Sequence, residues 1–169
     1  VGISPRKATS RELIKVNVEY PIHLINVAIS AGVRRFIGIG TALEYGTEAS
    51  RWDQIPPNAS LKPISEYAIS KASSSMMLRV LAQDKIEMFY GRLFSVFGDG
   101  QYFENLYPQL KKAALSKKDF KLTSGMQIRD FIHVQEVSKQ LLYAIQNQKI
   151  NLQNPLYVNI GTGVGTKVR

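Results

Sequence analysis

The chain has 169 residues, 44% hydrophobic and 21% charged, which is the length and composition of one globular domain with a buried core. It has no cysteine and only two histidines, His23 and His133, which excludes disulfides, thiolate nucleophiles and sulfur-based zinc sites and argues against a histidine-rich metal site. The formal net charge of +9 indicates an anionic partner, which could be a nucleic acid, a membrane or a phosphorylated small molecule.

No run of about 18 apolar residues occurs, and the first residues lack the basic-then-apolar order of a signal peptide. We therefore expect a cytoplasmic protein without a membrane partner. The basic residues are scattered, and none of their close pairs lies in an aromatic, glycine-rich nucleic-acid signature. We expect no nucleic-acid partner, although the net charge keeps a basic nucleic-acid-binding domain as an alternative.

The first predicted elements are a long buried helix and a buried strand. The helix begins with a capping box between Thr9 and Glu12 and ends at Gly32. The strand covers 33–40, where β-branched residues precede Gly38 and Gly40. These glycines leave room for another group to approach the backbone.

The rest of the chain predicts an α/β fold. A proline-containing loop at 47–63 leads into a helix at 64–84 and a strand at 86–93, and this order indicates a right-handed crossover between parallel strands. Further elements follow: a helix at 105–115, extended pieces at 120–122 and 128–134, a helix at 136–146, and a strand at 156–160 closed by a glycine turn at 161–163.

Tyr67 and Lys71 stand four residues apart in the second predicted helix, so their side chains project from the same face. A nearby ammonium favours the phenolate and lets a tyrosine of ordinary pKa about 10 exchange protons near neutral pH. This chemistry accompanies hydride transfer to a carbonyl or from an alcohol. The alternative is a surface pair on an ordinary helix.

Ligands of open parallel sheets bind beyond the carboxyl ends of the strands, and residues 40–46 follow the first predicted strand there. The Thr41 hydroxyl should therefore lie on the ligand face. The alternative is a β-branched residue that only satisfies a turn.

Four blocks of sequence, in order, resemble the extended short-chain dehydrogenase/reductases, in particular the NAD-dependent epimerase/dehydratase enzymes that act on nucleotide-sugars. The blocks are Thr41 with Tyr45-Gly46, the Tyr-x-x-x-Lys of Tyr67 and Lys71, the segment 92–98, and the segment 127–134. The resemblance implies an incomplete Rossmann-like parallel sheet with a small interleaved substrate-binding region. It places the NAD(P)-binding part at 1–98, the substrate-binding region at 99–127, and a truncated return to both at 128–169.

The resemblance also implies roles for individual residues. Tyr67 is the expected general acid/base, Thr41 bonds the same substrate oxygen, and Lys71 lowers the Tyr67 pKa and holds the nicotinamide ribose. The cofactor is NAD or NADP, and the residues expected to bind it are Asn17, Gly40, Tyr67, Lys71 and Phe94. For Asn17 an exposed polar residue within the helix is the alternative.

A nucleotide-diphosphate sugar is the implied substrate, and the residues expected to bind it are Thr41, Ser95, Asn105, Leu106 and Arg129. The Arg129 guanidinium would meet the diphosphate, with an ion pair to Asp130 as the alternative. His133 is expected to be structural, and the glycines at 161–163 are expected to form a turn rather than a phosphate cradle.

The family's opening glycine motif, Gly-x-x-Gly-x-x-Gly, does not occur in this sequence, so the chain resembles a fragment that binds dinucleotide poorly alone. Ala42 and Leu43 stand where sugar 4,6-dehydratases carry an acidic pair, which favours an epimerase or ketoreductase over a dehydratase. A non-catalytic relative that binds NAD or a sugar-nucleotide is a further alternative. The full-length protein is expected to be a homodimer.

Overall fold

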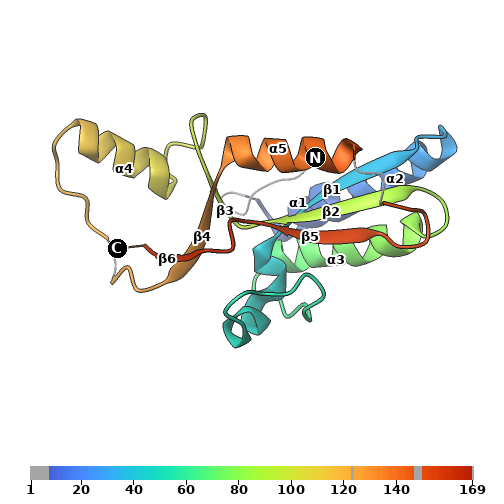
Figure 1. Cartoon of the computed structure of the whole chain (residues 1–169), viewed down its shortest axis with the longest axis horizontal. Helices are drawn as coiled ribbons and strands as arrows, with labels where there is room; N and C mark the ends of the chain where they lie inside the picture. Colours follow the sequence, from blue (N-terminus) through green and yellow to red (C-terminus); the bar gives the residue numbers. More distant parts are fainter. Residues whose placement is uncertain (1–7, 123, 147–149, 169) are drawn as a thin grey trace.

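A three-stranded parallel sheet forms the centre of the computed structural model, which describes residues 8–122, 124–146 and 150–168 (Figure 1). Its strands are β1 (Arg35–Thr41), β2 (Glu87–Leu93) and β5 (Leu156–Ile160), with β2 in the middle. All pairings are parallel, so the predicted α/β class and crossover are confirmed. The strand boundaries lie within two residues of the predicted ones.

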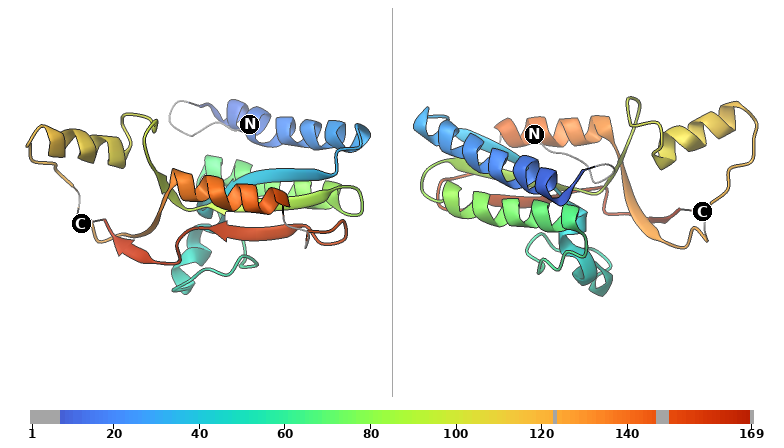
Figure 2. Two further views of the ribbon diagram at one scale, coloured as in Figure 1. Left: turned by 45° about the horizontal axis from the view of Figure 1, so that its top comes forward. Right: turned by 180° about the vertical axis from the view of Figure 1, so that it is seen from behind.

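Helices cover both faces of this sheet. Helices α2 (Tyr20–Ser30) and α3 (Glu66–Ala82) lie side by side on one face, and α5 (Val134–Gln146) lies on the other (Figures 1 and 2). Because side chains alternate along a strand, Met88 and Tyr90 of β2 enter the core under α2 and α3, whereas Phe89 enters the core under α5. Burial on both faces explains the continuous apolar run of β2.

The predicted first helix is three successive segments: α1 (Ser10–Ile14), a π-helical turn η1 (Lys15–Glu19), and α2. The capping box is confirmed, because the Thr9 side chain accepts from the Glu12 backbone and Glu12 accepts from the Thr9 N–H. The helix ends at Gly32, which adopts a φ of +68°. The π-helical turn in its interior has no signal in the hydrophobic pattern.

The connection from β1 to α3 differs from the predicted loop in its first part. Residues 42–51 form η2 (Ala42–Arg51), two 3-10 turns joined at Gly46, whose φ is +52°. A Cβ at Gly46 would overlap the backbone of Lys62, which bonds to the flanking residues through Thr47 N to Lys62 O and Lys62 N to Tyr45 O. Only glycine at position 46 allows the two loop segments, one around Gly46 and one around Lys62, to approach this closely.

A second, smaller group of elements lies beyond the carboxyl ends of the sheet. Strand β3 (Ser95–Phe97) pairs in parallel with β4 (Ile128–His133), and β4 pairs in antiparallel with β6 (Gly165–Lys167). The turn at 161–163 is confirmed: its backbone N–H groups at Thr162 and Gly163 donate to the Asp130 carboxylate. The predicted extended piece at 120–122 is instead irregular.

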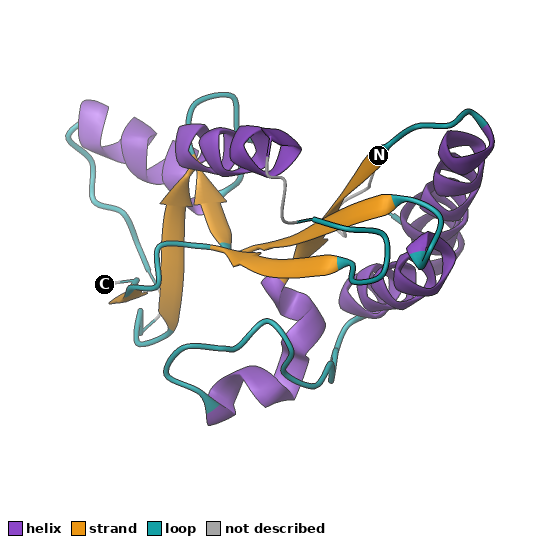
Figure 3. Cartoon of the chain, turned by 45° about the vertical axis from the view of Figure 1, so that its right-hand side comes forward, coloured by secondary structure: helices purple, strands orange, loops and turns teal. Residues whose placement is uncertain are grey.

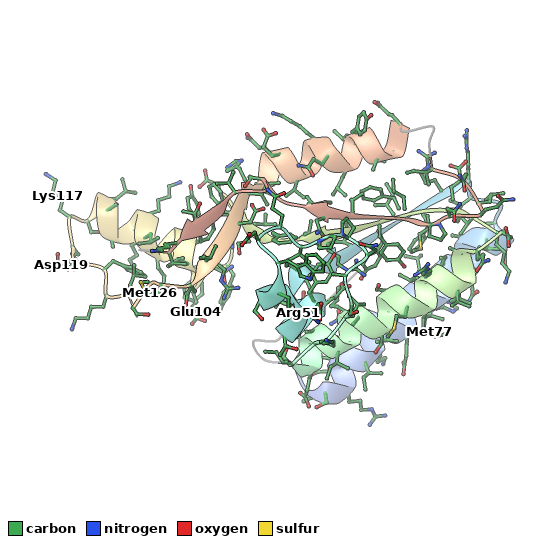
Figure 4. All side chains as sticks on the ribbon, turned by 60° about the horizontal axis from the view of Figure 1, so that its bottom comes forward. Arg51, Met77, Glu104, Lys117, Asp119 and Met126 are labelled. Atoms are coloured by element: carbon green, nitrogen blue, oxygen red, sulfur yellow. The ribbon has the colours of Figure 1, made fainter. Side chains whose placement is uncertain are left out.

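Helix α4 (Leu106–Leu115) buries none of its residues and lies at the left end of the molecule in Figure 1, and Figure 3 shows it joined to the strands through loops. Figure 4 shows Glu104, Lys117, Asp119 and Met126 at this end of the molecule. The predicted substrate-binding region at 99–127 is thus a separate lobe in space, while its role stays a prediction. No helix within the described part of the chain is long and apolar enough to cross a membrane.

Candidate active site

Thr41 ends β1 and caps the first turn of η2. Its Oγ1 accepts from the Leu43 N–H at 3.4 Å, and its own N–H donates to the Glu44 carboxylate at 2.9 Å. Thr41 therefore does cap a turn, as the alternative interpretation expected. The cap does not use the hydroxyl proton, which has no acceptor among the described residues, so Thr41 can still donate to a ligand oxygen.

Lys71 is nearly buried, with 8% of its surface exposed, and its Nζ donates to the Ile39 carbonyl at 2.6 Å. The alternative of a surface pair is wrong for this residue. Tyr67 precedes it by one turn and is partly buried. In the described part of the chain no hydrogen bond joins the two side chains directly.

Burial and the charge of Glu44 both act on the pKa values of this pair. Burial raises the pKa of the Tyr67 phenol, and the negative charge of Glu44 raises it further. Burial lowers the pKa of the Lys71 ammonium, and Glu44 opposes that change. The Lys71 ammonium bonds to the Ile39 carbonyl, and its expected effect on the Tyr67 pKa stays a prediction.

Asn17 is fully buried in the π-helical turn η1. Its Nδ2 donates to Ser70 Oγ at 3.0 Å, and Ser70 Oγ donates to the Tyr67 carbonyl at 2.8 Å. The exposed alternative for Asn17 is wrong. This short chain of hydrogen bonds braces the turn of α3 that carries Tyr67, and π-helical turns frequently occur at functional sites.

The space beside Gly38 and Gly40 is taken by the protein itself. A Cβ on either glycine would collide with the Tyr90 ring, and one on Gly40 would also collide with the Glu44 carboxylate. The prediction that these glycines admit an approaching group is right, but the group on that side is Tyr90. Cofactor binding by Gly40, and by the partly buried Phe94 just beyond β2, stays a prediction.

A buried ion pair that the sequence reading missed lies beneath these residues. Arg92 Nε donates to Glu44 Oε2 at 2.7 Å, with side-chain exposures of 5% and 0%. The same guanidinium donates to Pro57 O and Ser75 Oγ and lies 5.0 Å from the ring centre of Tyr45. The sequence did contain a signal for this pair. Glu44 lies in the strand-end motif and Arg92 in an otherwise apolar strand, and charged residues that become buried are normally paired.

The residues predicted to bind the substrate are divided between the two parts of the molecule. Ser95 begins β3, whereas Asn105 caps α4 and Leu106 is its first residue. Arg129 is exposed on β4. Among the described contacts none joins Leu106 or Arg129 to the site around Thr41.

Two alternatives are decided in this part of the structure. Arg129 makes no ion pair with Asp130 among the described residues, because the Asp130 oxygens accept from the 161–163 turn. His133 packs edge-on against Phe97 with ring centres 5.2 Å apart, and its Nδ1 accepts from the Gln135 N–H. These contacts support the structural role expected for His133.

Comparison with known proteins finds a matching family and several similar proteins. Residues 2–161 match the family model described as the NAD dependent epimerase/dehydratase family. A dTDP-D-glucose 4,6-dehydratase of Mus musculus is 30% identical over 135 residues, which are 78% of this chain and 37% of that protein. A UDP-glucose 4-epimerase of Erwinia amylovora is 28% identical, and the match covers 99% of this chain and 55% of that protein.

Solved structures share the fold. UDP-glucuronic acid 4-epimerase from Bacillus cereus in complex with NAD has a TM-score of 0.85 at 21% identity, covering 99% of this chain and 54% of that chain. MoeE5 in complex with UDP-glucose and NAD has a TM-score of 0.83 at 24% identity, covering 99% and 55%. The chain therefore spans about half the length of these structures, and between a third and just over half of the curated relatives.

Proposed function

Because this chain belongs to the NAD dependent epimerase/dehydratase family, we propose that the complete protein is a nucleotide-diphosphate-sugar epimerase or ketoreductase. The observation that supports it most is the buried Lys71 one turn from Tyr67, with the Thr41 hydroxyl at the carboxyl edge of the sheet. Such a constellation can exchange a proton with a sugar hydroxyl while hydride moves at the same carbon.

The residues around Lys71 fit a nicotinamide cofactor. Its ammonium has three N–H donors and Ile39 O is its acceptor within the described residues, so donors remain for a ribose hydroxyl. Lys71 and Tyr67 would hold the nicotinamide half, with Asn17, Gly40 and Phe94 nearby. A bound NAD would supply the hydride acceptor and donor of this site.

The raised pKa of Tyr67 keeps its phenol protonated near neutral pH. In that state it can donate a proton to a sugar ketone oxygen, which leaves a phenolate; in the oxidative direction the phenolate form takes the proton of the sugar hydroxyl. Thr41 can donate a second hydrogen bond to the same oxygen, which stabilises the negative charge that develops on it.

An epimerase or ketoreductase fits the chain better than a dehydratase does. Water elimination needs an additional acid and base, and Ala42 and Leu43 supply neither. Glu44, which follows these two residues in the sequence, has a fully buried carboxylate that is paired with Arg92. The retention of Thr41, Tyr67 and Lys71 together argues against a non-catalytic relative.

The full-length protein is proposed to be a cytoplasmic homodimer. A chain without cysteine needs no oxidising compartment. Support for the dimer comes from an apolar stripe on α3, which we define as Ile69, Met76, Met77 and Val80. These side chains are 45% to 71% exposed at spacings that bring them to one side of the helix, and Figure 4 shows Met77 on that outer side.

The variant Tyr67→Phe, made in the full-length protein, tests the proposed chemistry. The variant should lose hydride transfer from UDP-glucose to bound NAD by at least about 100-fold, because one general acid/base contributes roughly that much. NAD binding, measured by calorimetry, should change little. Tyr143→Phe, an exposed tyrosine on α5, is the control. Normal turnover in Tyr67→Phe would refute the mechanism.

A further inference from the structure

The turn at 161–163 encloses the side chain of Asp130. Asp130 Oδ1 accepts from the Thr162 N–H at 2.8 Å and from the Thr162 hydroxyl at 2.7 Å, and Oδ2 accepts from the Gly163 N–H at 2.8 Å. A Cβ at Gly161 would lie 2.4 Å from Oδ2, so the carboxylate rests against the bare backbone of the turn. Because hydrogen bonds to an ionised carboxylate are strong, one side chain of β4 holds this turn at three points.

The turn itself is held by two other elements. It follows β5 directly, and Ile160, the last residue of that strand, is fully buried and accepts at its carbonyl from the Phe94 N–H at 3.1 Å. Gln54, from the loop that precedes α3, donates through Nε2 to the Gly163 carbonyl at 3.0 Å. Asp130 therefore ties β4 to a point that the central sheet already fixes.

The part of β4 that Asp130 ties down has little other support. Strand β3 pairs only with 131–133, whereas Ile128, Arg129 and Asp130 pair only with β6 among the described strands. Strand β6 has three residues, all of them exposed. A two-stranded pairing this short is marginal at best without further contacts. The three hydrogen bonds of Asp130 supply those contacts.

Arg129 lies beside Asp130 on this strand. Successive side chains of a strand point to opposite faces, so Arg129 is directed away from the turn that holds Asp130. It is exposed, and its guanidinium has no hydrogen bond or ion pair within the described residues. The path of β4 therefore sets where the guanidinium lies. That direction matters because the planar guanidinium binds two phosphate oxygens at once only in the right orientation.

We propose that Asp130 is a positioning residue for the diphosphate of the substrate: by holding β4 to the turn at 161–163, it presents the Arg129 guanidinium to the nucleotide-diphosphate sugar. The inference rests on the proposed function, since it names the residue that directs the proposed diphosphate contact. The Asp130 oxygens are occupied by the turn, so this side chain touches no ligand. It acts through the backbone of β4.

Calorimetric binding of UDP or dTDP to the full-length protein tests this role, with whichever of the two binds the wild type. Asp130→Asn replaces one acceptor oxygen by an amide N–H donor that cannot accept from the turn. We expect the Kd of the nucleotide diphosphate to rise about 10-fold, because the charge-assisted contact of Arg129 is misplaced. The Kd of NAD should change little, since β1 and α3 do not contain the altered residue.

A double-mutant cycle distinguishes positioning from a merely structural role. If Asp130 acts through Arg129, Asp130→Asn should weaken nucleotide-diphosphate binding no further in a protein that already carries Arg129→Ala. A structural role would weaken binding in both backgrounds. Asp84→Asn is the control, because Asp84 is exposed in the turn before β2, at the opposite end of the strands, and should leave both Kd values unchanged.

A milder variant covers the case in which Asp130→Asn disturbs folding. Thr162→Val removes only the hydroxyl donor to Asp130 and leaves the two backbone donors in place. It should raise the Kd of the nucleotide diphosphate in the same direction by a smaller factor. An unchanged Kd in both variants, or an equal further loss when Asp130→Asn is added to Arg129→Ala, would overturn the proposal.

The same measurements separate this inference from the proposed function. In turnover, Asp130→Asn should raise KM for the nucleotide-sugar with kcat nearly unchanged, because the contact is made in the ground state and the transition state alike. Calorimetry needs no turnover. A protein that transfers no hydride but loses nucleotide-diphosphate affinity in Asp130→Asn would refute the proposed function and leave the role of Asp130 intact. A wild-type protein that binds neither UDP nor dTDP would overturn both.

Discussion

At the scale of single residues, the Glu44–Arg92 pair dominates the energetics beneath the site. Arg92→Met leaves a fully buried carboxylate without its cation, and we expect the free energy of unfolding to fall by roughly 3–5 kcal/mol. Adding Glu44→Gln to that variant should restore most of the loss. Urea unfolding measures both values.

Arg34→Met is the control for this prediction, because its side chain is 79% exposed and its ion pair with Glu87 is a surface contact. Such pairs contribute about 0–1 kcal/mol, so little change is expected. If Arg92→Met were no more destabilised than Arg34→Met, the buried pair would not be an anchor.

These residues also show what sequence could predict about the site. Thr41 at the end of the first strand and Lys71 on the helix face were predictable, because strand ends and helical spacing follow from local pattern. The contact of Glu44 with Arg92 was not, since the two lie 48 positions apart and depend on the register of β1 with β2. For the same reason the burial of Tyr67, which raises the pKa of its phenol, had no signal in the local pattern.

At the scale of elements, η2 depends on the glycine at its centre. Gly46→Ala combines a positive φ with overlap of the Lys62 backbone, so we expect a loss of unfolding free energy of about 1–3 kcal/mol or more. Gly32→Ala is the matched comparison, because Gly32 has a φ of +68° but open space around its Cβ position.

The difference between the two glycine variants isolates the overlap with Lys62. Thermal unfolding should give a lower Tm for Gly46→Ala than for Gly32→Ala, and equal values would show that the loop yields freely. Because η2 also carries the capping turn of Thr41 and Glu44, Gly46→Ala should lower hydride transfer as well.

Regular elements were predictable where a hydrophobic period ran for many residues, as in α3 and β2. The π-helical turn was not, because Asn17 is polar at a buried position and becomes satisfied only when Ser70 of α3 meets it. The 3-10 turns of η2 were missed for a similar reason, since tertiary contacts of Tyr45 and Lys62 hold a polar segment that reads as a loop.

At the scale of the whole molecule, the parallel sheet followed from the order strand, helix, strand, whereas the region around α4 was implied by the family resemblance and its position in space by neither pattern nor resemblance. The short strands β3 and β6 are three residues each, too short to carry a period. Their pairing with β4 sets the path of the chain between sheet and lobe. That path decides whether Arg129 can reach a ligand held at Thr41.

We predict from the apolar stripe on α3 that the protein dimerises through this helix. Val80→Glu places like charges opposite one another in a symmetric contact, which costs several kcal/mol, so the dimer dissociation constant should rise by roughly 100-fold or more. Leu142→Glu, at a position 59% exposed on α5, should leave the dimer intact. Sedimentation velocity on the full-length protein compares the dimer content of the Val80→Glu and Leu142→Glu variants. A Val80→Glu protein that remains a dimer at wild-type concentrations would show that this stripe is not the contact, because no symmetric interface centred on it could tolerate the paired carboxylates.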